Sequence, residues 1–157
     1  MTTRYGTNYQ NAYREDPKVS YPPGELGGTP KKLIERITLS AARQVGDVDY
    51  VGKLPANSFV TDAKVFISKS LGATGIVDLG HAASTDESGN AISADSDGLV
   101  DQADGGGQAA LKRANEASPS LFKRFGEETE LYLTWTEVMD GTVLDAVLTV
   151  EIEYVNK

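Results

Sequence analysis

The segment that decides the fold class runs from residue 131 to residue 155 and reads LYLTWTEVMDGTVLDAVLTVEIEYV. Apolar and polar residues alternate in it twice, over residues 131–136 and again over residues 147–154. Alternation with a period of two places one set of side chains on each face of an extended strand. An Asp-Gly pair lies between the two runs and favours a tight turn, which predicts a β-hairpin centred on Gly141. The apolar set consists of Leu131, Leu133, Trp135, Leu148, Val150, Ile152 and Tyr154.

The same alternation occurs in the first half of the chain, in residues 33–41 and 59–67. Glycines on both sides of Ala73 separate the second of these runs from the apolar residues 76–79, and this arrangement predicts another hairpin, centred on Ala73. Short strands, glycine-rich turns and no long amphipathic helix predict an all-β chain, folded as an antiparallel jelly-roll-like β-sandwich or barrel. The apolar faces of the two runs comprise Ile37, Leu39, Ala41, Phe59, Ala63, Val65 and Ile67.

Composition excludes several classes of protein. The chain has 157 residues, of which 39% are hydrophobic and 24% charged, a balance typical of one globular domain with an accessory segment. It contains no cysteine, which excludes disulfides, thiolate catalysis and cysteine-based metal sites. No apolar run approaches the roughly 20 residues of a membrane-spanning helix, and the start of the sequence lacks a secretory signal, so we expect a soluble, unexported chain.

The first 32 residues differ in composition from the remainder. They carry five basic and three acidic residues, whereas residues 33–157 carry ten basic and twenty acidic residues. Four of the six prolines and four of the seven tyrosines also lie in this segment. We therefore predict an extended N-terminal arm over residues 1–32 and a β-sandwich domain over residues 33–157.

Tyrosines in a segment that cannot fold alone suggest that the arm binds a partner, because they supply large contact area at a low cost in rotamer entropy. We expect the arm to be mobile in the isolated protein and to become ordered on that partner. The predicted contact residues are Arg4, Tyr5, Tyr9, Tyr13, Arg14, Lys18 and Tyr21.

Residues 84–108 are rich in Asp, Ser and Gly, and no Lys or Arg occurs between Ser70 and Leu111. We interpret residues 84–108 as a solvated loop with at most one helical turn, around residues 99–103. Its carboxylates lack the ligand spacing of a calcium loop. The one histidine, His81, has no catalytic motif around it, so we predict no catalytic residue, cofactor site or metal site.

The net charge of −8 disfavours binding to nucleic acid or anionic membrane surfaces. Two pairs of adjacent basic residues, Lys112 with Arg113 and Lys123 with Arg124, lie within the acidic body of the chain. We expect them either in intramolecular ion pairs or against an acidic partner surface. The periodicity of residues 109–114 is compatible with both a short strand and a turn of helix.

Three stretches together resemble a module of tailed-bacteriophage virion proteins. They are LPANSFVTDAKVFISKSLGATGIVDLGHAAS at residues 54–84, DGLVDQAD at residues 97–104, and the hairpin-like segment at residues 131–155. The resemblance spans roughly residues 33–155 and implies a capsid decoration, or cement, protein, or the related base of a head fibre. No motif in the arm matches the module.

As the resemblance implies, such a protein is a structural, non-enzymatic component of the virion that is made in the host cytoplasm. It would bind the outer surface of the assembled head and clamp neighbouring major capsid subunits. It would also self-associate, because a sandwich leaves open strand edges that association can cover and because the family acts at symmetry axes. We favour a trimer over a dimer. The alternative is a carbohydrate- or host-surface-binding sandwich, in which Trp135 and Tyr132 would stack on sugars and the acidic loop would bind calcium.

Overall fold

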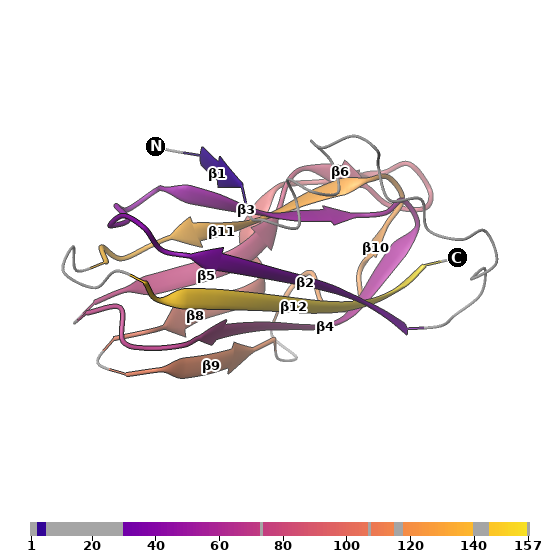
Figure 1. Ribbon diagram of the computed structural model, residues 1–157. Coiled ribbons are helices and arrows are strands. Elements are labelled where there is room, and N and C mark those ends of the chain that lie inside the picture. The colour runs from indigo at the N-terminus through magenta and orange to yellow at the C-terminus, as the bar shows by residue number, and fades with distance from the viewer. Residues whose placement is uncertain are drawn as a thin grey trace, which may run out of the picture.

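The computed structural model describes residues 30–72, 74–106, 108–114, 118–139 and 145–156, together with the backbone of residues 3–5. These residues form two β-sheets that face each other across one core (Figure 1). Sheet A contains, in spatial order, β1 (Thr3–Tyr5), β3 (Val48–Leu54), β11 (Thr129–Trp135), β5 (Ile76–His81) and β8 (Asp95–Asp104). Sheet B contains β2 (Pro30–Thr38), β12 (Val147–Asn156) and β4 (Ser58–Ile67), with β9 (Ala110–Arg113) and β10 (Arg124–Phe125) both paired to β4. A small hairpin is formed by β6 (Ser84–Thr85) and β7 (Ala91–Ile92).

Strand pairing confirms the predicted fold class. β2 pairs with β12, β3 with β11, β4 with β9 and β5 with β8, and all four ladders are antiparallel. The strands of the first half thus meet those of the second half in reverse order, which is the nested pairing of a jelly roll. The described residues contain no helix, and therefore none that could cross a membrane.

Apolar residues of the two inner faces fill the space between the sheets. Alternation is regular in β11, where Leu131, Leu133 and Trp135 are completely buried, and in β12, where Leu148, Val150 and Ile152 are too. Full burial of one such side chain contributes roughly 1.5–3 kcal/mol relative to its exposure. The sequence prediction of which face of these two strands points inward is therefore confirmed.

Both predicted hairpins are wrong. β11 lies in sheet A and β12 in sheet B, and β4 and β5 are divided between the sheets in the same way. The turn residues themselves, Ala73 and residues 140–144, lie outside the described part of the chain. Alternation specifies which face of a strand is buried, but a chain that crosses to the opposite sheet buries that face equally well.

One strand also presents a different face from the one its alternation predicts. In β4 the register with β12 shifts between Glu153 and Tyr154, so that Thr61 is an extra residue in the ladder. Such a bulge reverses the faces on its two sides. Val60 is consequently buried, whereas Phe59, which we expected in the core, lies half-buried on the outer face of sheet B.

The interpretation of residues 84–108 as a solvated loop is wrong for most of its length. The segment forms β6, β7 and β8, and Leu99, Val100 and Ala103 of β8 are buried in the core rather than in a helical turn. Register shifts along the β5–β8 ladder break the period of two, which explains why the pattern does not read as a strand. Residues 110–113, left open between helix and strand, form the strand β9.

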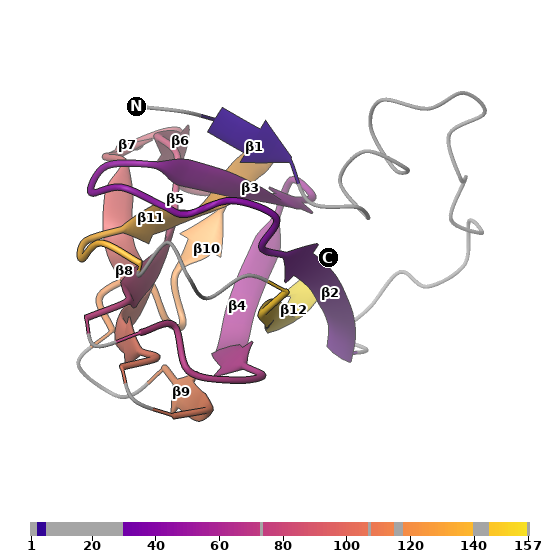
Figure 2. The ribbon, with the colours of Figure 1, turned by 60° about the vertical axis from the view of Figure 1, so that its left-hand side comes forward.

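The N-terminal arm lies mostly outside the described residues. β2 begins at Pro30, within the range assigned to the arm, and residues 3–5 form β1. β1 runs parallel to β3 at the edge of sheet A, where Arg4 is in register with Asp49 (Figure 2). The division of the chain after residue 32 stays a prediction.

A buried ion pair attaches the β2–β3 connection to sheet A. Arg43 donates from Nε to Oδ2 of Asp49 at 2.9 Å and from Nη2 to Oδ1 at 3.1 Å. Asp49 Oδ2 also accepts the indole N–H of Trp135 at 2.9 Å, and Arg43 Nη1 donates to the carbonyl of Ala41 at 2.7 Å. Because Arg43 and Asp49 are 2% and 1% exposed, each charge depends on the other for compensation.

Replacement of Asp49 by Ala should lower the free energy of unfolding by about 3–5 kcal/mol, because it leaves the Arg43 guanidinium buried without a counter-charge. Urea denaturation of the purified protein measures this loss. The double variant Arg43→Met/Asp49→Leu should recover much of it, since no charge then remains buried. A loss below about 1 kcal/mol in Asp49→Ala would mean that water or other groups compensate Arg43.

Candidate interaction surface

The outer face of sheet B carries a network of alternating charges. Lys32 of β2 lies 2.9 Å from Glu151 Oε1 and 2.8 Å from Glu153 Oε1, both on the neighbouring strand β12. Lys64 of β4 contacts the same Glu151 oxygen at 3.0 Å from the other side. Opposite charges therefore lie on adjacent strands, which is the favourable arrangement for a cross-strand pair.

The network continues across β4 to the edge strand β9. Asp62 accepts contacts from Lys64 at 3.2 Å and from Arg113 at 2.8 Å. This face of sheet B thus carries three cations and three carboxylates in contact: Lys32, Lys64, Arg113, Asp62, Glu151 and Glu153. The charges within this network balance, whereas the chain as a whole has a net charge of −8.

These contacts shift the acid–base equilibria of the groups involved. Hydrogen bonds from Lys32 and Lys64 lower the pKa of Glu151. Burial alone would raise the pKa of Asp62, but hydrogen bonds from Arg113 and Lys64 outweigh it and the pKa is lowered. Hydrogen bonds to Glu153 and Glu151 raise the pKa of Lys32. All of these shifts favour the charged forms that the network requires.

Exposed apolar side chains lie beside this network. Phe66 of β4 and Leu111 of β9 are register partners and are 44% and 64% exposed. Ile34 of β2, on the same face, is 42% exposed. Partly exposed apolar groups among paired charges are typical of a surface that contacts other protein, although single ones are common on any surface.

A second cluster on the outer face of sheet B is aromatic. The rings of Phe59 and Phe122 lie 6.1 Å apart, and the Arg124 guanidinium carbon lies 5.9 Å from the centre of the Phe59 ring. Arg124 also pairs with Glu87 at 3.1 Å. Together with the Arg113–Asp62 contact, this pair confirms intramolecular ion pairing for one residue of each basic pair.

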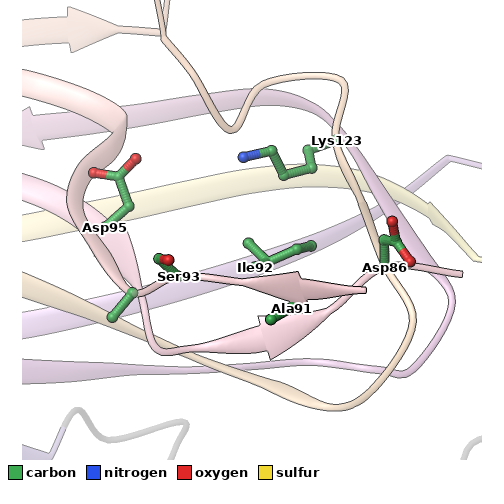
Figure 3. A pocket seen from close by; sticks show the side chains of 7 residues that line it. Asp86, Ala91, Ile92, Ser93, Asp95 and Lys123 are labelled. Carbon is green, nitrogen blue, oxygen red and sulfur yellow. The ribbon is translucent and has the colours of Figure 1, made fainter. Parts of the chain in front are cut away.

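A polar pocket of about 400 Å³ lies between the β6–β7 hairpin and the segment that precedes β10 (Figure 3). Lys123 extends across it with its ammonium group turned toward Asp95. Asp86, at the rim, already accepts hydrogen bonds from the backbone N–H groups of Ser88 and Asn90, both at 2.8 Å, and so fixes the turn of the hairpin. Among the described residues, no cluster of three or more carboxylate or imidazole groups could hold a metal ion.

His81 is part of the core. Its Nδ1 lies 2.8 Å from the carbonyl of Ala82 and its Nε2 lies 2.7 Å from Ser120 Oγ, while Phe125 packs edge-on against the ring at 4.9 Å. Burial lowers the pKa of His81, so the ring is neutral near pH 7. Nδ1 then carries the proton, and the Ser120 hydroxyl donates to Nε2. Both side chains are fully buried, so this pair offers a substrate no access.

The residues near His81 in sequence do not join it to form a triad. Asp78 Oδ1 accepts the backbone N–H of Gln102 at 2.7 Å, and Ser84 Oγ lies 2.6 Å from Thr129 Oγ1. The residues proposed for sugar stacking are engaged within the fold as well. Trp135 is completely buried, and Tyr132 donates its hydroxyl to the carbonyl of His81 at 2.9 Å.

The predicted contact residues of the arm cannot be placed together. Arg4 and Tyr5 belong to β1, for which the backbone alone is described. The others, Tyr9, Tyr13, Arg14, Lys18 and Tyr21, lie outside the described residues. Their role in binding stays a prediction. The exposed Phe122 ring and its contact with Phe59 are features that the sequence analysis did not predict.

Comparison with known proteins finds likeness in structure alone. No protein-family model matches the sequence, and no curated protein matches it. A chain of the capsid of Ralstonia phage GP4 has a similar structure, with a TM-score of 0.67, 16% identity and 99% of both chains covered. A chain of the capsid asymmetric unit of cyanophage Pam1 gives a TM-score of 0.57 at 13% identity, over 90% of this chain and 95% of the other. At these identities the likeness concerns the fold.

The charge network predicts a defined dependence of stability on pH. The pKa of Glu151 is lowered in the folded state, so its contribution is fully present above the unfolded value, about 4.3, and is lost as pH falls through the folded value. Glu151→Gln should therefore be less stable than the wild type near pH 7, and the difference should shrink on acidification below about pH 4.

Thermal or urea unfolding across this pH range measures that difference. The control is Glu137→Gln, because Glu137 makes no ion pair among the described residues, and this variant should follow the wild type at every pH. The contrary result is a difference in free energy of unfolding between Glu151→Gln and the wild type that stays constant as the pH falls well below the folded pKa of Glu151. That result would show that the charge of Glu151 does not stabilise sheet B.

Proposed function

We propose that this protein is a capsid decoration, or cement, protein of a tailed bacteriophage. The observation that carries the proposal is the full-length likeness of fold to a chain of the GP4 capsid, which covers 99% of both chains. The Pam1 capsid chain supports it with a second, independent match. The resemblance of residues 54–84, 97–104 and 131–155 to phage virion proteins points in the same direction.

In this role the protein would bind the outer surface of the assembled head and clamp neighbouring major capsid subunits. A clamp acts by burying surface and forming hydrogen bonds across a joint, and many weak contacts can together give high avidity without any chemistry. The described surface suits this role, because the charges of its network are paired and apolar side chains are exposed on it, while His81 is buried in the core. We propose a structural, non-enzymatic role on this basis.

The arm would add anchoring contacts to those of the sandwich. For this, β1 would have to leave the edge of sheet A on the capsid. Extended chain advances about 3.1 Å per residue, so an arm of roughly 30 residues released in this way could reach on the order of 90 Å, across a neighbouring capsid subunit. Tyr5, Tyr9, Tyr13 and Tyr21 would be buried there, while Arg4, Arg14 and Lys18 would meet acidic groups. The alternative of a sugar-binding module is less well supported, because Trp135 is inside the core.

Binding to capsids tests this function directly. Purified protein should co-sediment with expanded capsids that lack it, in an amount that saturates at many copies per particle, and should raise the temperature at which the capsids release DNA. A few copies per particle would indicate the base of a head fibre instead. No co-sedimentation at micromolar concentration would contradict the proposal.

The same assay separates the arm from the sandwich. A variant that lacks residues 1–29 retains the whole of β2 and loses only the three-residue strand β1 from the edge of sheet A, so its melting temperature should fall only slightly. We expect it to lose most of its capsid occupancy, since the arm carries the tyrosine anchors. If a folded truncated protein kept full occupancy, the sandwich alone would make the contact.

Self-association is the remaining part of the proposal. Among the described strands, the long strands β2 and β8 each pair on one side only, with β12 and β5, and such open edges are commonly covered by association. We expect a homotrimer in light scattering of the purified protein at micromolar concentration, with its mass unchanged on dilution tenfold. A monomer both in solution and on the capsid would contradict this expectation.

A further inference from the structure

Phe122 has a backbone conformation that its side chain disfavours. Its φ angle is +63°, in the left-handed region that glycine and asparagine adopt readily and bulky residues adopt rarely. Its side chain is also 58% exposed, so the ring gains little from burial. A phenylalanine here is unfavourable on both counts. Backbone strain of this kind often marks a residue that acts on a partner rather than in the fold.

The surrounding structure holds Phe122 in this conformation. The N–H of Phe122 donates to the carbonyl of Val60 at 2.9 Å, and the N–H of Ser120 donates to that of Gly98, also at 2.9 Å. Ser120 is fixed in turn by its hydrogen bond to His81. A side-chain carbon on Gly98 would come within 2.6 Å of Ser120 Oγ, so the approach of β8 to this turn requires glycine. The ring is thus presented from a rigid base.

The neighbours of Phe122 indicate what it could contact. The Phe59 ring lies beside the Phe122 ring, and the Arg124 guanidinium lies over the Phe59 ring. The two rings therefore form a hydrophobic surface next to a cation. Lys123, the next residue, lines the pocket of Figure 3 and makes no side-chain hydrogen bond or ion pair with the described residues. Exposed aromatic rings beside cations are the groups that most often dominate the affinity of protein interfaces.

We propose that Phe122, supported by Phe59, inserts into an apolar pocket of the capsid subunit, and that Lys123 pairs with a carboxylate at the rim of that pocket. This inference rests on the proposed function and identifies the part of the sandwich that makes the contact. A rigid, outward-facing ring loses little entropy on binding, which suits insertion. A second copy of this chain is a poorer partner, since a contact centred here on a two-fold or three-fold axis would bring together the Lys123 and Arg124 cations of neighbouring copies.

The test uses the full-length protein with Phe122→Asn, because asparagine tolerates a positive φ and lacks the ring. If the Phe122 ring stabilised the fold, its removal would lower the melting temperature. We expect the opposite: a melting temperature equal to or above that of the wild type, together with at least a tenfold loss of affinity for capsids. The matched control is Val45→Asn, which removes a comparably exposed apolar side chain from the β2–β3 connection, outside the candidate surface, and should bind as the wild type does.

Lys123→Gln supplies an independent readout without altering the strained turn. It should weaken binding several-fold at low salt and reduce the dependence of binding on salt concentration. Failure of the wild type to bind capsids would overturn the proposed function itself. If the wild type binds, three results would overturn this inference alone: wild-type affinity in Phe122→Asn, a melting temperature several degrees lower, or a change in oligomeric state that shows a second copy to be the partner.

Discussion

Every major ladder of this fold joins a strand from residues 30–81 to a strand from residues 95–156. β2, β3, β4 and β5 do not pair with one another, because β12 lies between β2 and β4, and β11 lies between β3 and β5. The strands β2, β3, β4 and β5 therefore cannot join into sheets before β11 and β12 pair with them. Contacts so distant in sequence are slow to form, since the loop between them must close before they stabilise anything. Once formed, they make the sandwich a single cooperative unit that can present a fixed surface.

This pairing also explains which features could be predicted from the sequence. Alternation in β11 and β12 correctly identified Leu133 and Val150 as core residues, because the faces of a regular strand follow from its period. The pairing partner of each strand is determined by packing between segments that are distant in the sequence. An Asp-Gly pair indicates only a local turn and does not predict that partner. Bulges also limited the prediction of core residues. The extra residue at Thr61 places Phe59 on the outer face of β4. Register shifts along β8 break the alternation, so Leu99 could not be predicted as a core residue.

The candidate surface was less predictable than the fold. Ion pairs for the basic residues could be expected, but their partners Asp62 and Glu87 lie far away in the sequence and are set by strand register. The strained conformation of Phe122 could not be predicted from the sequence, because a positive φ is expected for glycine or asparagine and not for phenylalanine. The burial of His81 in the core was not predicted, and its partner Ser120 could not be identified before β8 and the turn before β10 were placed together.

The functional proposal combines a fold seen in two phage capsids with a surface whose charges are paired and whose exposed rings are held rigidly. These properties suit a protein that acts by binding to a repeated lattice, where modest affinity at each site is multiplied over many copies. Cryo-electron microscopy of capsids reconstituted with the purified protein tests this account most directly. It predicts sandwich-shaped density on the outer surface, repeated across the lattice and in contact with at least two capsid subunits. Density confined to the tail vertex or to the capsid interior, or no added density, would contradict it.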